Sequence, residues 1–485
     1  MSKLYIFGIG GTGSRVLKAL TMLLATGVKI EASEIVPIII DPDHAAADLS
    51  RTVKAMREYT KIHNTLKYNS TTNNQFFNTK INLEIIPKVT MPLHRTADVT
   101  FRDYIDMGSM NGPHNGYDAN YALASMLFSD SNLSSKMDVG FKGNPNIGSI
   151  VLNQFASSDD FKTFASTFQQ GDRIFVISSI FGGTGASGFP LLVKNLRTIS
   201  NTIPGCGNVK NAPIGAITVM PYFDVAPDHD GKSQIDASTF ISKTKAALSY
   251  YDRNMSEVNS LYYIADEISK QYNNSEGGST QRNDAHFVEL ASALSIIDFC
   301  KIPDDELKTT DGVPDQPSFK EFGIKECKGD IIFGDLYPGT LQGIQKPMTQ
   351  FVLFCKYMRE QLNSSLKQTW AVAHQFDHNY INGTFYRSDL TSFRESFWTW
   401  MTEMSTNVRA SNPFNLEASK SDLFSLVKGI IPAKVMKLPS NYALYDDYLN
   451  TVQSKLNKDS NKESRFVELF HKATTEIVKD KLRMN

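Results

Sequence analysis

The chain has few cysteines, no excess of either charge and no long apolar run. Its 485 residues include four cysteines without a CxxC pair, so nothing indicates a zinc knuckle or a disulfide framework. Fifty lysine and arginine residues oppose 51 aspartate and glutamate residues, which gives no overall attraction to nucleic acid or to an anionic membrane. No apolar run approaches the roughly 20 residues that span a bilayer, and no leader is recognisable. We therefore expect a cytoplasmic protein with no transmembrane segment and no direct nucleic-acid partner.

The first 300 residues alternate between apolar runs and stretches of helical spacing. Lys3–Ile9 precedes a run of glycines, helical spacing covers Arg15–Thr26, and Glu34–Ile40 is a second apolar run that ends at Asp41. This order of strand, turn, helix and strand predicts a βαβ unit with a parallel sheet. Further strands are expected over 173–178, 213–220 and 260–265, and a helix over 284–299. We predict a doubly wound α/β domain over residues 1–300.

Beyond that domain the pattern changes. Ile302–Pro317 has the composition of a linker, and residues 318–485 are mostly helical by spacing, which predicts a helical C-terminal domain. Within the first domain, Asn64–Lys80 is polar and rich in asparagine and threonine. We expect that stretch to be an excursion on the surface.

Two glycine segments follow predicted strands. Residues 8–13 read GIGGTG, and residues 182–185 read GGTG. A turn from strand to helix exposes the first N–H groups of the helix, which attract phosphate together with the helix dipole. Glycine lets phosphate oxygens reach those groups without meeting a Cβ. Two such segments at one sheet edge can hold a polyphosphate from both sides, and Thr184 adds a hydroxyl for phosphate or Mg²⁺.

These segments resemble those of the tubulin/FtsZ superfamily. GGTGASGFP, from Gly182 to Pro190, looks like the signature GGGTG[ST]G, and FGIGGTGSRVLKAL is similar to the first glycine loop and helix of FtsZ. GGSTQRNDAHFVEL, Gly277–Leu290, is similar to a segment of bacterial tubulin-like proteins. The resemblance implies a Rossmann-like doubly wound GTPase domain with a long central helix near 284–299. It implies GTP or GDP with Mg²⁺ as the ligand.

The resemblance also implies which residues bind the nucleotide, and all of them come from predicted loops. The first loop would supply Gly8, Gly10, Gly11, Thr12 and Gly13, and an acidic loop would supply Asp41 and Asp43 near the metal or the phosphate edge. Asn111 and Gly112 would form a loop that senses the γ-phosphate. Gly182, Gly183, Thr184, Gly185, Ala186 and Ser187 would hold phosphate, Pro221 would lie at the ribose, and Asn283 would read the guanine edge.

Hydrolysis is where the sequence departs most from the family. In tubulin and FtsZ, acidic residues after the central helix of one subunit position water in the site of its neighbour. No NxDxxD-like loop is recognisable here, and Asp298, Asp304 and Asp305 are candidates by position only. Phe181 replaces the first glycine of the signature, and Arg15 stands where FtsZ has asparagine.

Three functions are open at this point. The first is a self-assembling, filament-forming GTPase of a bacterial cytoskeletal, membrane-remodelling or defence system, with copies of itself and proteins of the same system as partners. The second is a guanine-nucleotide switch or scaffold without turnover. The third is a ThiF-like adenylating enzyme, whose GxGGxGS start fits, although such enzymes lack a second GGTG segment. An NAD-binding domain fits less well because Asp41 follows the first glycine segment at more than the usual spacing of roughly 20 residues.

Overall fold

A seven-stranded parallel sheet forms the centre of the first part of the chain. The computed structural model describes residues 2–67, 76–86, 88–97, 99–111, 119–138, 140–225, 237–266, 271–272, 278, 283–327, 329–434 and 440–484. The strand order is β3-β2-β1-β4-β5-β7-β11, and every pair in it is parallel. The strands are β1 (Lys3–Ile9), β2 (Glu34–Ile40), β3 (Lys80–Ile81), β4 (Arg173–Ser179), β5 (Ile214–Val219), β7 (Ser260–Ile264) and β11 (Ser318–Glu321). This is the doubly wound order, which reverses direction between β1 and β4, so the predicted α/β class is confirmed.

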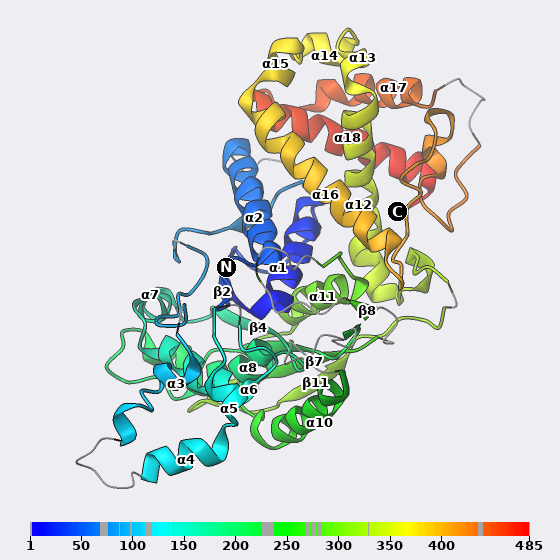
Figure 1. Cartoon of the computed structure of the whole chain (residues 1–485). Helices are drawn as coiled ribbons and strands as arrows, with labels where there is room; N and C mark the ends of the chain where they lie inside the picture. The colour runs from blue at the N-terminus through cyan, green and yellow to red at the C-terminus, as the bar shows by residue number, and fades with distance from the viewer. Residues whose placement is uncertain are drawn as a thin grey trace.

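Both faces of the sheet are buried, which explains the nearly continuous apolar runs of its strands. Successive side chains alternate, so Leu4 and Ile6 enter one core while Tyr5 and Phe7 enter the other. The first core is shared with α1 (Gly10–Ala25), α2 (Ala47–Leu66) and α11 (Phe287–Lys301). The second is shared with α6 (Pro145–Leu152), α7 (Asp159–Thr167), α8 (Gly183–Arg197) and α10 (Ala237–Asn254). Figure 1 shows these helices on the two faces.

Short elements complete this part of the chain. They are α3 (Phe101–Tyr104), η1 (Ser109–Asn111), α4 (Ala119–Leu127), α5 (Asp130–Leu133), η2 (Asn153–Ser157), α9 (Cys206–Lys210), and the two-residue strands β6 (Asp224–Val225), β8 (Gln271–Tyr272), β9 (Thr309–Thr310) and β10 (Val313–Pro314). The edge strand β11 lies beyond residue 317, so the sheet takes a strand from the range that we assigned to the C-terminal domain.

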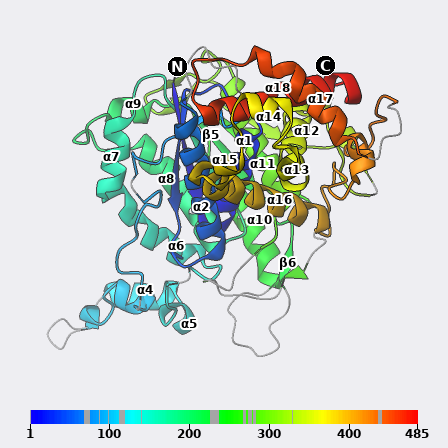
Figure 2. The ribbon, with the colours of Figure 1, turned by 90° about the horizontal axis from the view of Figure 1, so that it is seen from above.

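The remainder is mostly helical, as predicted. Its elements are η3 (Phe333–Asp335), α12 (Pro338–Glu360), α13 (Leu362–Ser365), α14 (Thr369–Ala373), α15 (His378–Asn382), η4 (Phe385–Leu390), α16 (Thr391–Thr406), η5 (Lys420–Ser425), α17 (Tyr442–Val452), η6 (Gln453–Lys455) and α18 (Lys462–Leu482). Seen from above, these helices lie on one side of the sheet and α6, α7 and α8 on the other (Figure 2). The C-terminal helices continue the core of α1, α2 and α11. No described helix is both long and apolar enough to cross a bilayer.

The expectation that Asn64–Lys80 is an excursion on the surface is wrong for Phe76 and Phe77. Phe76 and Phe77 are fully buried, and their rings meet Phe351 of α12 and Phe393 of α16 at centroid distances of 5.1 Å each. The polar composition of the stretch concealed this contact, because the apolar cover comes from helices far along the chain, α12 and α16. Residues 68–75 lie outside the described part.

Candidate functional site

The two glycine segments meet at the switch point of the sheet. Gly8 of β1 lies opposite Ile177 of β4 in the parallel register, so the carboxyl ends of these neighbouring strands share one edge, where open α/β sheets bind ligands. A cleft of about 190 Å³ opens there. It is lined by Gly10, Gly11, Thr12, Arg15, Asp41, Asp43, Ala46, Asp48, Gly140, Phe141, Lys142, Gly143, Ser179, Phe181, Gly182, Gly183, Thr184, Gly185, Phe223 and Asn283.

Neither glycine segment is a free loop, because each forms the first turn of a helix. Helix α1 begins at Gly10 and α8 begins at Gly183, and neither has a side-chain cap or an acidic residue in its first turn. The first N–H groups of a helix have no partner within the helix. Two uncapped helix starts therefore open on one cleft, and the partial positive charge of both dipoles favours an anion between them.

Several of these glycines are required by packing alone. A Cβ on Gly13 would lie 2.4 Å from the backbone carbon of Gly8, so the pair lets α1 approach β1 closely. A Cβ on Gly185 would lie 2.5 Å from the carbonyl oxygen of Ser179. Gly10 has a φ of +69°, which favours glycine by itself. These positions hold the loops in shape, and Gly8 and Gly13 do not line the cleft.

Gly11 has no packing reason to lack a side chain. The nearest atom to a Cβ built there is Nη1 of Arg15, at an ordinary contact distance of 3.7 Å. The space beside this backbone is part of the cleft. A methyl group at Gly11 would therefore fill a space that is open in the native chain. A phosphate oxygen needs such a space to reach backbone N–H groups.

The third wall of the cleft comes from residues 140–143, which sequence reasoning missed. A Cβ on Gly183 would meet the backbone nitrogens of Asn144 and Gly143 at 3.0 and 3.2 Å, so this segment packs directly on the start of α8. Its glycine spacing, GFKG, was the available signal. Gly112 lies outside the described residues, and Asn111 belongs to η1 with its side chain undescribed; neither is among the described residues that line the cleft.

Two buried carboxyl groups lie at the end of β2. Asp41 and Asp43 are each 5% exposed. The Asp43 carboxylate accepts hydrogen bonds from the N–H groups of Ala45 and Gly278, at 3.1 and 2.6 Å. Burial, reinforced by the charges of Asp43 and Asp48, raises the pKa of Asp41 to about 7. A cation bound beside Asp41 would reverse this effect, since it stabilises the ionised carboxylate.

Arg15 crosses the floor of the site. Its Nε lies 2.6 Å from Glu289 of α11, one Nη lies 3.2 Å from Asp48 of α2, and the other donates to the hydroxyl of Tyr222 at 2.7 Å. All four side chains are buried. Arg15 was noted in the sequence as a departure from FtsZ; here it ties together three helices beneath the cleft, and two carboxylates neutralise its charge.

Asn283 lines the cleft and is held by charged neighbours. Its side-chain amide nitrogen donates to Asp48 at 3.2 Å, and its backbone carbonyl oxygen accepts from Arg51 at 2.6 Å. Arg51 also donates to Glu403 of α16 at 2.9 Å, and Glu403 accepts from the N–H of Ala285. A C-terminal helix therefore helps to hold the segment that carries Asn283.

Three other predicted residues do not line the cleft. Ser187 donates its hydroxyl to the carbonyl of Gly183 at 2.6 Å, so it braces α8 from within. Ala186 lies behind the loop, where its carbonyl accepts from Tyr251. Pro221 follows β5 and stays outside the lining set.

The candidate catalytic acids lie at the opposite end of the sheet. Asp304 pairs with Arg173 at 2.6 Å. Arg173 begins β4, whereas the cleft lies at the end of that seven-residue strand, roughly 20 Å away. Asp298 accepts from Tyr262 and Lys320, at 2.7 and 2.9 Å. Asp305 is exposed on the linker beside Asp304. The cleft therefore gets none of these acids from its own chain.

The residues of the cleft fit a nucleotide with a divalent cation. The cradle and the two helix starts suit phosphate, and the oxygens of Asp41 and Asp43 are of the kind that Mg²⁺ takes. Among the described residues no three His, Cys, Asp or Glu side chains gather into a metal site. A cation here would thus need phosphate oxygens as further ligands, as Mg²⁺ at nucleotide sites commonly does.

Comparison with solved structures gives matches of low sequence identity. A point mutant of FtsZ from M. jannaschii is 13% identical, over 54% of this chain and 46% of that chain, with a TM-score of 0.25. CetZ2 from Haloferax volcanii, a GTPγS-bound protofilament, is 13% identical, over 63% of this chain and 60% of that chain, with a TM-score of 0.30. The chain thus spans less than two thirds of either protein. No protein-family model and no curated protein matches the sequence.

Proposed function

We propose that this chain is a guanine-nucleotide-binding protein of the tubulin/FtsZ type that assembles with copies of itself. The observation that carries the proposal is the convergence of two uncapped helix starts, α1 and α8, on one cleft at the switch point of the sheet. A single helix start suits one phosphate group, whereas two starts on one cleft suit the length of a diphosphate or triphosphate.

Each wall of the cleft then has a part in binding. The backbone of Gly10 to Thr12 holds the phosphates from one side, and that of Gly182 to Gly185 holds them from the other. Asp41 and Asp43 hold Mg²⁺ together with the phosphates. Asn283 contacts the base, because an amide offers both a donor and an acceptor, as the guanine edge requires.

Hydrolysis, in this proposal, needs a second copy of the chain. When bound, GTP supplies a terminal phosphate that water can attack, and positioning and electrostatics provide most of the acceleration. Asp304 pairs with Arg173 at the start of β4, roughly 20 Å from the cleft of its own chain by the length of that strand. Asp298 lies near the C-terminal end of α11, whose first turn is the end closer to the cleft. Only a head-to-tail neighbour could bring these acids to the cleft. Asp305 is the best placed, because Asp298 and Asp304 are engaged in ion pairs with Lys320 and Arg173.

A scaffold without turnover is the second candidate, and the same ion pairs favour it. If the pairs of Asp298 and Asp304 persist in the assembly, two of the three acids are withheld from water. Assembly would then depend on which nucleotide is bound, without hydrolysis.

Phosphate release and light scattering, followed together over a series of protein concentrations with GTP and with ATP, test the proposal. A GTPase rate per chain that rises with concentration, together with scattering, supports the self-assembling GTPase. Guanine-nucleotide binding with scattering and no phosphate release supports the scaffold. Turnover that is strictly proportional to protein concentration contradicts a site completed by a neighbour.

A further inference from the structure

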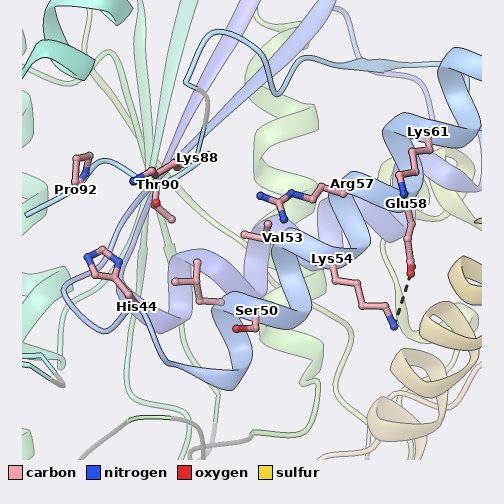
Figure 3. Close-up of a pocket in the computed structure, with 11 residues that line it drawn as sticks. His44, Ser50, Val53, Lys54, Arg57, Glu58, Lys61, Lys88, Thr90 and Pro92 are labelled. Atoms are coloured by element: carbon pink, nitrogen blue, oxygen red, sulfur yellow. Dashed lines mark ion pairs between the residues drawn. The ribbon is translucent and has the colours of Figure 1, made fainter.

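A second concave site lies beside α2, outside the glycine cleft. It has a volume of about 620 Å³, within the range of small-molecule sites. Figure 3 shows it between α2 and the segment that carries Lys88, Thr90 and Pro92. Its lining residues, called here the α2 groove, are His44, Leu49, Ser50, Val53, Lys54, Arg57, Glu58, Lys61, Lys88, Thr90 and Pro92.

The α2 groove concentrates positive charge on a chain whose net charge is −1. Among the described residues, four cationic side chains line it, and Glu58 is the one carboxylate. Glu58 is already engaged: it pairs with Lys54 at 3.7 Å and accepts from the hydroxyl of Ser392 on α16 at 2.5 Å. The other three cations, Arg57, Lys61 and Lys88, are exposed and form no ion pair within the described residues.

Like charges lie close together along this side of the α2 groove. Arg57 and Lys61 are four residues apart on one helix, and like charges at that spacing destabilise it. In Figure 3 the Arg57 side chain extends from α2 toward the segment of Lys88, whereas Lys54 turns to Glu58. An anion in the α2 groove would relieve this repulsion and accept hydrogen bonds from the guanidinium of Arg57.

The rest of the lining defines the ligand further. The hydroxyls of Ser50 and Thr90 suit phosphate or sugar oxygens, and Leu49, Val53 and Pro92 supply an apolar surface. We propose that the α2 groove binds a small phosphorylated molecule, at a site separate from the glycine cleft. This inference does not depend on what the glycine cleft binds.

The two sites are neighbours along the chain. Asp43 and Asp48 line the cleft, whereas His44, Leu49 and Ser50, the residues directly after them, line the α2 groove. A ligand that shifts the first turn of α2 therefore acts on both sites, and any coupling between their ligands must be reciprocal.

Amine labelling tests the proposal residue by residue. The intact protein is acetylated with and without inorganic pyrophosphate, and mass spectrometry reads each lysine. We expect protection of Lys61 and Lys88, with none at the exposed Lys308 and Lys455. Equal labelling of all four lysines with and without pyrophosphate would overturn the proposal.

A charge-matched pair of variants completes the test. In Arg57→Ala/Lys88→Ala, the pyrophosphate concentration that half-protects Lys61 should rise about tenfold, which corresponds to roughly 1.4 kcal/mol. In Lys308→Ala/Lys455→Ala that concentration should not change. The groove variant should also keep its melting temperature, and a clear drop would show that the cations are structural and overturn the proposal. A third outcome is that the native chain binds phosphatidylglycerol vesicles, the groove variant does not, and pyrophosphate protects no lysine. That result would assign the α2 groove to a membrane surface and would also overturn the proposal.

Discussion

The guanidinium of Arg15 lies 2.6 Å from the carboxylate of Glu289. The contact joins the helix that starts at the first glycine segment to α11, at a sequence separation of 274 residues. Glu289 also closes a capping box at the start of α11 with the backbone of His286. The contact therefore fixes the phosphate side of the cleft relative to the segment that carries Asn283.

Loss of Arg15 should be strongly destabilising. Arg15→Leu leaves Glu289 buried without its cation and leaves Asp48 with Arg51 as its cationic partner, and breaking a buried pair from one side costs about 3–5 kcal/mol. Urea unfolding measures the change. Arg253→Leu, at an exposed position on α10, is the matched control and should change stability by less than about 0.5 kcal/mol. Equal effects of the two substitutions would contradict the assigned role.

Asp41 should make stability depend on pH. Burial raises the pKa of its carboxyl to about 7 in the folded chain, above the unfolded value of about 3.9. The folded state therefore binds the extra proton, and stability is lost as pH rises from about 4 through about 7. Asp41→Asn removes this loss while keeping an acceptor for the N–H of Asp43. In the absence of nucleotide and Mg²⁺, the free energy of unfolding of Asp41→Asn minus that of the native chain should increase as pH rises. The increase should be at most about 4 kcal/mol. If the difference in unfolding free energy between the two chains stays constant from pH 4 to pH 8, the raised pKa of Asp41 is contradicted.

Gly11 and Gly185 should respond differently to alanine. Gly11→Ala should keep the fold, because its Cβ meets only Arg15 Nη1 at 3.7 Å, but weaken nucleotide binding by at least about tenfold, or 1.4 kcal/mol. Gly185→Ala places its Cβ 2.5 Å from the Ser179 carbonyl and should cost about 1–3 kcal/mol of stability. Gly207→Ala is the control for both, since no atom of the described residues lies within 4 Å of a Cβ built there. Calorimetry and thermal melts separate the two effects.

Asp305 should matter for turnover and not for binding. If a neighbour completes the site, Asp305→Asn should slow GTP hydrolysis by about 10²-fold or more with unchanged nucleotide affinity. Mixing it with Gly11→Ala chains should restore part of the activity, because each variant supplies what the other lacks. Unchanged hydrolysis by Asp305→Asn would place the acid elsewhere.

The sequence was sufficient wherever the signal is local. The apolar runs predicted β1 and β2 with the bounds that the structure has. The two glycine segments were correctly placed at strand ends, because the residue types that form a turn are adjacent in the sequence. The contacts that close the site are not local. Residues 140–143 reach Gly183 only because α6 packs beside α8, and Asp48 reaches Arg15 only because α2 lies against α1. The burial of Phe76 and Phe77 likewise depends on α12 and α16, which no periodicity near residue 76 could indicate.

The most direct test is the nucleotide that the purified protein carries. The native chain and Gly11→Ala are denatured, and the released nucleotide is identified and quantified by chromatography. We expect GDP or GTP near one per native chain, a large loss of bound nucleotide from Gly11→Ala, and an unchanged nucleotide content in Gly207→Ala. Adenine nucleotide, or the same guanine-nucleotide content in Gly11→Ala, would contradict the assignment of the cleft.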